Sequence, residues 1–473
     1  MSTSYLTELP YYENSCIYFE QISNEAWPVF LDSCKPASTL GRYDILSAQP
    51  YSHLTTYGKT TTITSPKGTI QSDADPFSLV KQQLALHSAF NSHLPFNGGA
   101  LGYFAYDLKQ RLEELPDTVI HDITLPDMSV GIYLWAVIVD HLEKKTYLLM
   151  PPKDRCPENW HEIKNRLTSA SPEGERFFAP TDSGDSLYVD NPPSVGAKNL
   201  SPSGDNRRSN LTQDQYSEKF TQIMQHINQG DTYQINFAQR WQSTFDENPW
   251  DLYQHLREKN PAPFSAYIPM PQGAILSCSP ERFLTVNNRE VITMPIKGTA
   301  KRESDPILDQ QAAQTLLNSE KNRAENIMIV DLMRNDLGKS CITGSVHVAK
   351  LCELQSFTNV HHLVSTVCGQ LRADKQPIDL LRDCFPGGSI TGAPKIRAME
   401  LIDQFEPHQR HIYCGSIGYI NFNGQMDTNI AIRTIVINDN HLYFWGGGGI
   451  VKDSQADLEY QETLDKVRPF LNM

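Results

Sequence analysis

Runs of apolar residues along the chain predict strands that lie mostly in antiparallel hairpins. The runs at 131–140 and 141–149 predict one long buried hairpin. At 98–107 three glycines stand among aromatic residues, which predicts a strand that another backbone approaches closely. Further strands are predicted at 231–237, 360–370, 412–422, 428–437 and 441–451.

Helical patterns are interspersed with these strands. A capping box, Thr212 to Gln215, opens an amphipathic helix that runs through Ile227. The stretch 309–338 is predicted as a helix that stops at Gly338, and a last helix is predicted at 454–472. Strands and helices in this mixed order, with several hairpins, indicate an α+β fold with antiparallel sheets.

One segment, 169–210, interrupts this pattern. Ser, Pro, Gly, Asp and Asn dominate it and apolar periodicity disappears, which is typical of a flexible connector. We therefore predict an N-terminal subdomain at 1–168, a connector at 169–210, and a C-terminal catalytic subdomain at 211–473.

The stretch 277–299 holds the strongest candidate for chemistry. Two β-prone runs flank a polar turn, so that Glu281 and Lys297 lie directly opposite each other, roughly 5 Å apart, if the turn is centred on Arg289. If it is centred between Asn288 and Arg289, the register shifts by one and the two side chains separate to opposite faces. We favour the first register, because an acid and an amine at two strand ends make a reactive site. A solvated ion pair of little energetic weight is the other interpretation.

Composition narrows the class of protein. A net charge of −14 over 473 residues argues against nucleic-acid binding. No stretch approaches 18 uninterrupted apolar residues and the N-terminus lacks a signal-peptide pattern, so no membrane association is expected. The nine cysteines are scattered without a Cys-x-x-Cys pair, which fits a reducing cytoplasm.

Three glutamates are candidate ligands for Mg²⁺. Glu459 and Glu462 stand at i and i+3 on one face of the last helix, and Glu325 lies on another helix. Carboxylates gathered from two helices are a common way to hold magnesium. A surface helix carrying acids is the alternative.

Two glycine-rich segments could bind an anion. The segment around Ser389 leads into a helix, and the run Gly446–Gly449 ends a strand with bare backbone amides. Tight turns are the alternative.

Arg433 lies in an apolar strand context and needs a carboxylate or a bound anion, whereas His362 in a similar context is more often a core residue. Together these groups predict a site for a dianion, with a Lys and a Glu at the reacting ring.

Seven motifs, densest from 277 to 466, make the chain similar to the chorismate-utilising enzymes. They read Ser279-Pro-Glu-Arg-Phe283, Pro295-Ile-Lys-Gly-Thr299, Arg323-Ala-Glu-Asn326, Asp331-Leu-Met-Arg-Asn-Asp336, His361-His-Leu-Val-Ser365, Gly387-Gly-Ser-Ile-Thr-Gly-Ala-Pro-Lys395 and Glu459-Tyr-Gln-Glu-Thr463. This resemblance implies a two-subdomain α/β/β/α sandwich with two large facing antiparallel sheets.

The resemblance also implies a reaction. Ammonia would replace the C4 hydroxyl of chorismate, giving 4-amino-4-deoxychorismate with pyruvate retained, in the para-aminobenzoate branch of folate synthesis. Lys297 favours this reaction, because the similar anthranilate synthases carry alanine there. An anthranilate synthase component I, which would release pyruvate, is the second interpretation. A non-catalytic chorismate- or tryptophan-binding subunit is a third interpretation. Since the sequence shows no glutaminase Cys-His-Glu domain, ammonia would come from a glutamine amidotransferase partner or from free ammonium.

Residue roles follow from the same resemblance. Lys297 would attack C2, Glu281 would be the general acid, and Mg²⁺ would bind Glu325 and Glu462 with Glu459 close by. The positions that match residues lining chorismate are His362, Ser389, Tyr419, Arg433, Gly447, Gly449 and Lys466. Some relatives hold a tryptophan at positions that match Ser33, Leu40, Gly41, Arg42, Tyr43, Pro263, Phe264 and Ser265.

Overall fold

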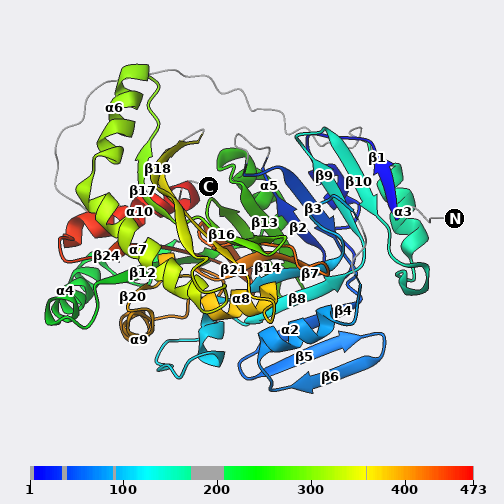
Figure 1. Ribbon diagram of the computed structural model, residues 1–473, viewed down its shortest axis with the longest axis horizontal. Coiled ribbons are helices and arrows are strands. Elements are labelled where there is room, and N and C mark those ends of the chain that lie inside the picture. Colours follow the sequence, from blue (N-terminus) through cyan, green and yellow to red (C-terminus); the bar gives the residue numbers. More distant parts are fainter. Residues whose placement is uncertain (1–4, 35–39, 89–91, 172–206, 358–359, 472–473) are drawn as a thin grey trace.

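Two large antiparallel sheets form the centre of the molecule. The computed structural model describes residues 5–34, 40–88, 92–171, 207–357 and 360–471. Each sheet has twelve strands among these residues. The predicted α+β fold with two large antiparallel sheets is confirmed, and Figure 1 shows helices on both sides of them.

The first sheet contains both the first and the last strand of the chain, β1 and β24. Its strands run in the order β1 (Leu6–Leu9), β10 (Lys145–Leu149), β9 (Ala136–Asp140), β3 (Tyr43–Ser47), β2 (Val29–Asp32), β13 (Phe264–Met270), β14 (Gly273–Ser279), β23 (Thr434–Asn438), β24 (His441–Ile450), β12 (Gln234–Thr244) and β11 (Arg208–Ser209), with β20 (Gly392–Ala393) also pairing β12.

The second sheet carries the predicted hairpin near one edge. Its strands run in the order β17 (Ile296–Lys301), β19 (Val360–Gln370), β16 (Glu290–Thr293), β15 (Arg282–Asn287), β22 (Met426–Asn429), β21 (Ser416–Asn421), β7 (Gly99–Phe104), β8 (Met128–Tyr133), β4 (Ser52–Tyr57), β5 (Thr60–Ser65) and β6 (Gly68–Ser72), with β18 (His347–Ser356) also pairing β19.

Helices cover the outer faces of the two sheets. The α-helices are α1 (Cys16–Glu20), α2 (Pro76–Leu84), α3 (Trp160–Thr168), α4 (Gln213–Gln229), α5 (Pro249–Lys259), α6 (Pro306–Leu317), α7 (Glu320–Gly338), α8 (Pro377–Cys384), α9 (Lys395–Phe405) and α10 (Ala456–Leu471), and the 3₁₀ turns are η1 (Tyr106–Arg111), η2 (Lys153–Arg155) and η4 (Gly388–Ile390). Helices α1, α3, α5 and α10 pack on the first sheet, and α2, α7 and α8 pack on the second.

The two sheets face each other across a shared core. Ile138 and Ile275 of the first sheet belong to one buried cluster with Leu54 and Leu284 of the second. In β9, Ile138 points into this cluster while Val137 and Val139 contribute to the cluster under the outer helices. A strand that is buried on both faces explains the uninterrupted apolar run in the sequence.

The predicted hairpin over 131–149 is only half right. Strand β8 ends at Tyr133 in the second sheet, and the chain passes through Leu134 and Trp135 to begin β9 in the first. Only β9 and β10 form a hairpin. All the residues around the crossing are buried, so apolar pattern alone does not reveal where the chain changes sheets.

Two other predicted elements divide in the structure. The helix at 309–338 becomes α6 and α7, because Ser319 begins a new helix by accepting a hydrogen bond from the Asn322 amide. The strand at 428–437 becomes β22 and β23, which lie in different sheets and are joined through Arg433. The capping box is confirmed: Thr212 and Gln215 exchange hydrogen bonds of 2.9 and 3.2 Å at the start of α4.

Both halves of the chain contribute to both sheets within the described residues. The division at 169–210 stays a prediction, since most of that segment lies outside the described residues. No helix in the described part is long and apolar enough to cross a membrane.

Candidate active site

The hairpin at 277–299 adopts the register that we did not favour. Val286 pairs with Val291 and Asn287 with Glu290, so the turn is centred between Asn288 and Arg289. Both turn residues have positive φ, 48° and 68°, as the two-residue turns that match strand twist require. The prediction of a turn centred on Arg289 is therefore wrong.

Lys297, however, does not belong to this hairpin. Strand β16 ends at Thr293, and after Pro295 the chain begins β17, which pairs with β19 through Ile296 and Val364. Glu281 precedes the first residue of β15. The alternation rule that would separate the two side chains applies only within a continuous strand, so it does not decide where they lie.

Glu281 and Lys297 meet at a third segment, the 3₁₀ turn η4. The Lys297 ammonium donates to the Ser389 carbonyl oxygen at 3.0 Å, and the Ser389 hydroxyl donates to Glu281 Oε1 at 2.7 Å. The side-chain amide of Asn236 on β12 donates to the same Ser389 carbonyl at 3.1 Å. The acid and the amine are therefore neighbours, as expected, but they are held by Ser389.

Burial sets the protonation behaviour of this pair. Glu281 is 4 % exposed, and burial raises the pKa of its carboxyl although Ser389 and Lys297 both favour the charged form. Burial also lowers the pKa of the Lys297 ammonium, an effect that nearby carboxylates, Glu325 foremost, only partly oppose. A neutral amine and a protonated carboxyl are what nucleophilic attack and proton donation need. The burial of Glu281 rules out the solvated ion pair.

The three glutamates gather from two helices onto the glycine strand. A Cβ on Gly448 would lie 3.2 Å from both Glu459 Oε2 and Glu462 Oε1, so these carboxylates share one face of α10 as predicted. On α7, Glu325 lies 3.9 Å from the Lys321 ammonium, which is also 3.4 Å from Glu459. The three carboxylates therefore lie around β24 and the Lys321 side chain.

This donor set fits Mg²⁺ in its chemistry, but it is not arranged as a closed metal cage. Within the described ranges, no three His, Cys, Asp or Glu side chains converge tightly enough for one ion. Glu459 Oε2, by contrast, is buried and has no hydrogen-bond partner, and burial raises the pKa of Glu325. An unpaired buried carboxylate oxygen beside a second, partly buried acid favours a cation as the missing partner.

The glycine strand offers backbone where side chains are excluded. A Cβ on Gly447 would lie 2.7 Å from Ala238, and one on Gly449 would lie 2.6 Å from the side chain of Gln234. Lys466 donates to the Gly447 carbonyl at 2.9 Å and lies 2.6 Å from Glu462. Burial raises the pKa of Glu462, but Lys466, Lys297 and Lys321 together outweigh this effect and lower it. Gly447, Gly449 and Lys466 thus lie together at one edge of the site.

Arg433 and His362 form a second edge, in which only Arg433 carries a positive charge. Among the residues that the structure describes, the Arg433 guanidinium makes no hydrogen bond or ion pair, and burial lowers its pKa. Burial and the nearby charge of Arg433 lower the pKa of His362 to about 4, so this imidazole is neutral and shares a 2.9 Å hydrogen bond with Thr299. An unpaired, desolvated guanidinium is suited to a bound carboxylate.

Tyr419 lies elsewhere. It lines a cavity of about 290 Å³ together with most of the residues predicted for tryptophan, namely Leu40, Gly41, Arg42, Tyr43, Pro263, Phe264 and Ser265. Ser33 adjoins this cavity, because a Cβ on Gly41 would lie 3.1 Å from it. The structure thus brings the predicted tryptophan residues together and places Tyr419 with them, not beside Lys297 as the sequence suggested.

Comparison with known proteins places this geometry in a family. The family described as chorismate binding enzyme matches residues 28–472. The chain belongs to this family. It is 44 % identical to aminodeoxychorismate synthase component 1 of Escherichia coli, over 96 % of this chain and 94 % of that protein. It is equally 44 % identical to the same component of Klebsiella aerogenes, over 96 % and 95 %.

A solved family member confirms the fold. The crystal structure of anthranilate synthase component I from Streptococcus pneumoniae superposes with a TM-score of 0.75, at 31 % identity, covering 92 % of this chain and 93 % of that one. The family resemblance that the motifs predicted is confirmed.

Sequence reasoning missed two polar residues that lie beside the glycine strand. Gln234 is fully buried, and neither its amide nitrogen nor its oxygen has a partner, while Asn236 holds the Ser389 carbonyl. Both lie on β12 with one residue between them, so they share a face beside Gly449. Strand β12 also carries Gln239, Arg240 and Gln242, so the polar pattern alone did not single out these two amides.

Proposed function

We propose that this chain converts chorismate and ammonia to 4-amino-4-deoxychorismate, as component 1 of an aminodeoxychorismate synthase. The observation that carries the proposal is the pair formed by the buried Glu281 and the half-buried Lys297, which Ser389 holds together. Similarity to the E. coli component at 44 % identity supports it. Lysine at 297 favours this reaction over that of anthranilate synthases.

The reaction proceeds through an amine adduct of the ring. The lone pair of Lys297 attacks C2, electrons shift along the two ring double bonds, and the C4–O bond breaks. Glu281 gives its proton to the departing hydroxyl, which leaves as water. Ammonia then attacks C4, the electrons shift back, and the C2–N bond to Lys297 breaks. The enolpyruvyl group takes no part, so pyruvate is retained.

The remaining groups hold the two carboxylates of chorismate. The amides at Gly447 and Gly449, with Lys466, offer donors to one region of the substrate, and the unpaired guanidinium of Arg433 offers a counter-charge. Glu325, Glu459 and Glu462 would hold Mg²⁺. When bound, Mg²⁺ supplies positive charge that neutralises a substrate carboxylate, which four nearby acids would otherwise repel.

Ammonia comes from a partner in this proposal. Relatives carrying the name component 1 imply a second component, which we propose to be a glutaminase subunit. Free ammonium replaces it when the chain acts alone.

For the 290 Å³ cavity we propose tryptophan as the ligand. Aromatic and aliphatic side chains line it together with polar groups such as Arg42 and Asp427, and the Arg282 guanidinium lies 4.9 Å above the Phe264 ring at its wall. Calorimetric titration with tryptophan, with Gly41→Trp as the control that fills the cavity, tests this ligand.

Product analysis tests the main proposal most directly. Purified chain is incubated with chorismate, ammonium and Mg²⁺, and the products are separated and assayed for pyruvate. A non-aromatic amine without pyruvate is expected. Anthranilate with stoichiometric pyruvate would assign the chain to the sibling reaction, and unchanged chorismate would leave only a binding role.

A further inference from the structure

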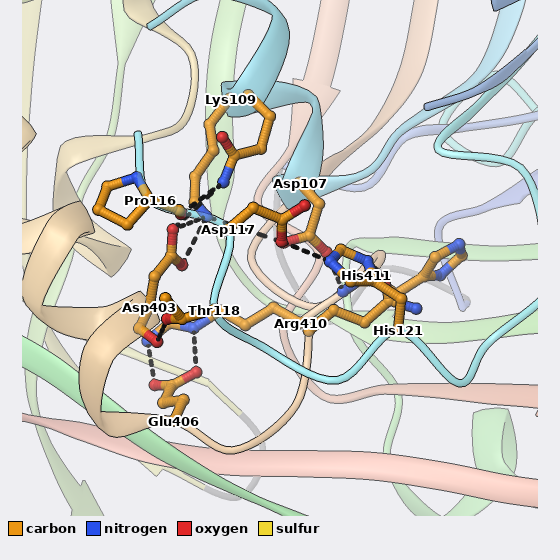
Figure 2. A network of polar contacts seen from close by, with 12 residues as sticks. Asp107, Lys109, Pro116, Asp117, Thr118, His121, Asp403, Glu406, Arg410 and His411 are labelled. Atoms are coloured by element: carbon orange, nitrogen blue, oxygen red, sulfur yellow. Dashed lines mark hydrogen bonds and ion pairs between the residues drawn. The ribbon is translucent and has the colours of Figure 1, made fainter. Parts of the chain in front are cut away.

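A buried pair of charges, Arg410 and Glu406, lies behind the reacting groups. Arg410 is 1 % exposed and its guanidinium contacts both oxygens of Glu406, at 2.8 and 2.6 Å. Glu406 also accepts a 2.8 Å hydrogen bond from the Ala238 amide of β12. Figure 2 shows the two side chains extended toward each other from the segment that follows α9.

The other donors of this guanidinium reach two separate backbone segments. Arg410 donates to the Ile390 carbonyl at 3.0 Å and to the Asn236 carbonyl at 2.6 Å. Ile390 directly follows Ser389, and Asn236 is the residue whose side chain holds the Ser389 carbonyl. One planar group thus fixes η4 and β12 relative to each other, immediately next to the oxygen that accepts from Lys297.

A second buried ion pair supports the first. The Lys109 ammonium of η1 contacts both oxygens of Asp403 on α9, at 2.6 and 2.8 Å. The Tyr106 ring lies between the cations, 4.8 Å from Lys109 and 4.8 Å from Arg410. Figure 2 shows Lys109 of η1 reaching Asp403 near the end of α9, three residues before Glu406.

Stability alone is a poor reason for such a cluster. Desolvating two charges costs several kcal/mol per ion, and well-packed apolar residues often replace buried ion pairs without loss. What apolar residues cannot do is satisfy two carbonyls from different segments at once. The rigid fork of arginine, with five donors, is suited to that task, whereas lysine offers a single point charge.

We propose that Arg410 is a positioning residue for the reaction, which sets the Ser389 carbonyl, and through it the Lys297 amine, at the distance needed for attack on the ring. Glu406 acts by orienting the guanidinium. The inference rests on the proposed function, because it assigns a role relative to Lys297. Arg410 itself touches neither Lys297 nor Glu281 among the described contacts.

The test compares Arg410→Lys and Arg410→Gln with a matched control, Arg240→Gln. Arg240 lies on β12, is 2 % exposed, grips Asp122 through two bonds of 2.6 and 2.7 Å, and lies 4.8 Å over the Tyr443 ring. It is thus a second buried arginine that binds a carboxylate and an aromatic ring, and it makes no contact with η4 among the described residues. Melting temperature, kcat and KM for chorismate are measured with free ammonium as the nitrogen source.

Arg410→Lys is expected to lower kcat about 10- to 100-fold, because a displacement of the order of 1 Å at the reacting atoms costs this much. KM for chorismate should change little, because the Arg410 guanidinium contacts none of the groups proposed to hold the substrate carboxylates. Arg240→Gln should lower the melting temperature comparably to Arg410→Gln while kcat stays near that of the unmodified enzyme. Glu406→Gln, which keeps shape and volume, should lower kcat less than Arg410→Lys does.

Wild-type kcat in both Arg410→Lys and Glu406→Gln would overturn the inference. So would an equal loss of kcat in Arg240→Gln at equal thermal stability, since the effect would then be structural. Absence of aminated product from the unmodified chain, by contrast, would overturn the proposed function itself. The two failures are therefore distinguishable in one set of assays.

Discussion

Lys297 and Glu281 share Ser389 as a hydrogen-bond partner, one at its carbonyl and the other at its hydroxyl. The carbonyl can only accept, so it orients the amine, and the hydroxyl donates to the acid, so it favours the carboxylate form. One residue therefore positions both reacting groups, through its backbone for the amine and through its side chain for the acid. This separation makes the two roles open to independent tests.

Replacing Lys297 with alanine is expected to abolish or divert turnover while chorismate still binds. The amine is the nucleophile, whereas the carboxylates of the substrate are held by other groups, so kcat should fall by about 10³-fold or more with the dissociation constant little changed. Product analysis and equilibrium titration measure the two quantities. Lys301→Ala, an exposed lysine on the same strand, is the control. Turnover at the normal rate by Lys297→Ala would remove the covalent mechanism.

Removing the Ser389 hydroxyl is expected to move the pH profile upward. Burial raises the pKa of Glu281, and the hydrogen bond from Ser389 partly offsets this by stabilising the carboxylate. In Ser389→Ala the offset is lost while the backbone carbonyl that holds Lys297 remains. The limb of kcat/KM against pH on which Glu281 loses its proton should therefore shift to higher pH, by up to about one unit. A profile that stays in place, or shifts downward, would contradict the assignment of Glu281 as the acid.

The sequence predicted features that depend on neighbouring residues, such as helix caps, better than features that depend on the packing of strands far apart in the chain. The Thr212–Gln215 capping box and the shared face of Glu459 and Glu462 depend on residues three apart, and both are confirmed. The exchange of sheets at Leu134 and again near Arg433 depends on where distant strands pack, and apolar pattern carries no such information. The register of the hairpin at 277–299 goes with a two-residue turn in which Asn288 and Arg289 both have positive φ. The sequence allowed either turn and so did not decide the register.

The candidate site shows the same limit. Glu281 and Lys297 were identified from their motifs, but the hairpin argument gave the wrong cause for their proximity. Ser389 joins them from a segment 108 and 92 positions away along the chain, respectively. Gln234 escaped notice because a glutamine in a strand carries no functional signal until its burial without a partner is seen.

Chelation of Mg²⁺ is expected to stop the reaction, and Glu459→Gln should raise the Mg²⁺ concentration needed for activity by at least about tenfold. The unpaired Oε2 of Glu459 is the observation behind this expectation. Titration of activity against Mg²⁺, together with direct calorimetric binding, measures the effect. Asp465→Asn on the same helix, an exposed residue paired with Arg468, is the control. Full activity in excess chelator would rule out the carboxylates as a metal site.

Gln234→Leu is expected to stabilise the protein and to impair it as an enzyme. Leucine removes a buried amide without partners, so the free energy of unfolding should rise by about 1 kcal/mol or more. If the amide is kept for substrate or ammonia, kcat/KM should fall at the same time. Denaturant unfolding and steady-state kinetics measure the two effects.

Gln239→Leu is the matched control for this change. Gln239 lies on the same strand, is equally buried, and has both amide atoms bonded, to Ser209 and Thr463 at 2.6 Å each. Its replacement should destabilise the protein. If Gln234→Leu is destabilising to the same degree, the amide has an unrecognised structural partner and no reserved role.

Stability is expected to depend on pH through Asp107, at the edge of the network in Figure 2. Burial raises the pKa of Asp107 to about 6, with Asp127 and Asp403 adding to the effect and Lys109 and the His411 amide opposing it. The folded state thus holds this proton more tightly than the unfolded state, whose value is near 3.8. Ionisation therefore costs stability progressively as the pH rises from about 4 to about 6, and the cost is complete above that range.

Asp107→Asn should remove this cost, because asparagine stays neutral and its carbonyl can still accept from the His411 amide, which now donates at 2.7 Å. The variant is expected to be more stable than the unmodified protein at pH 8, by up to about 3 kcal/mol, and no more stable at pH 4. Urea unfolding at both values measures the difference. A variant that is less stable at pH 8 would mean that attraction between the Asp107 carboxylate and Lys109, 3.9 Å apart, outweighs the burial of the charge.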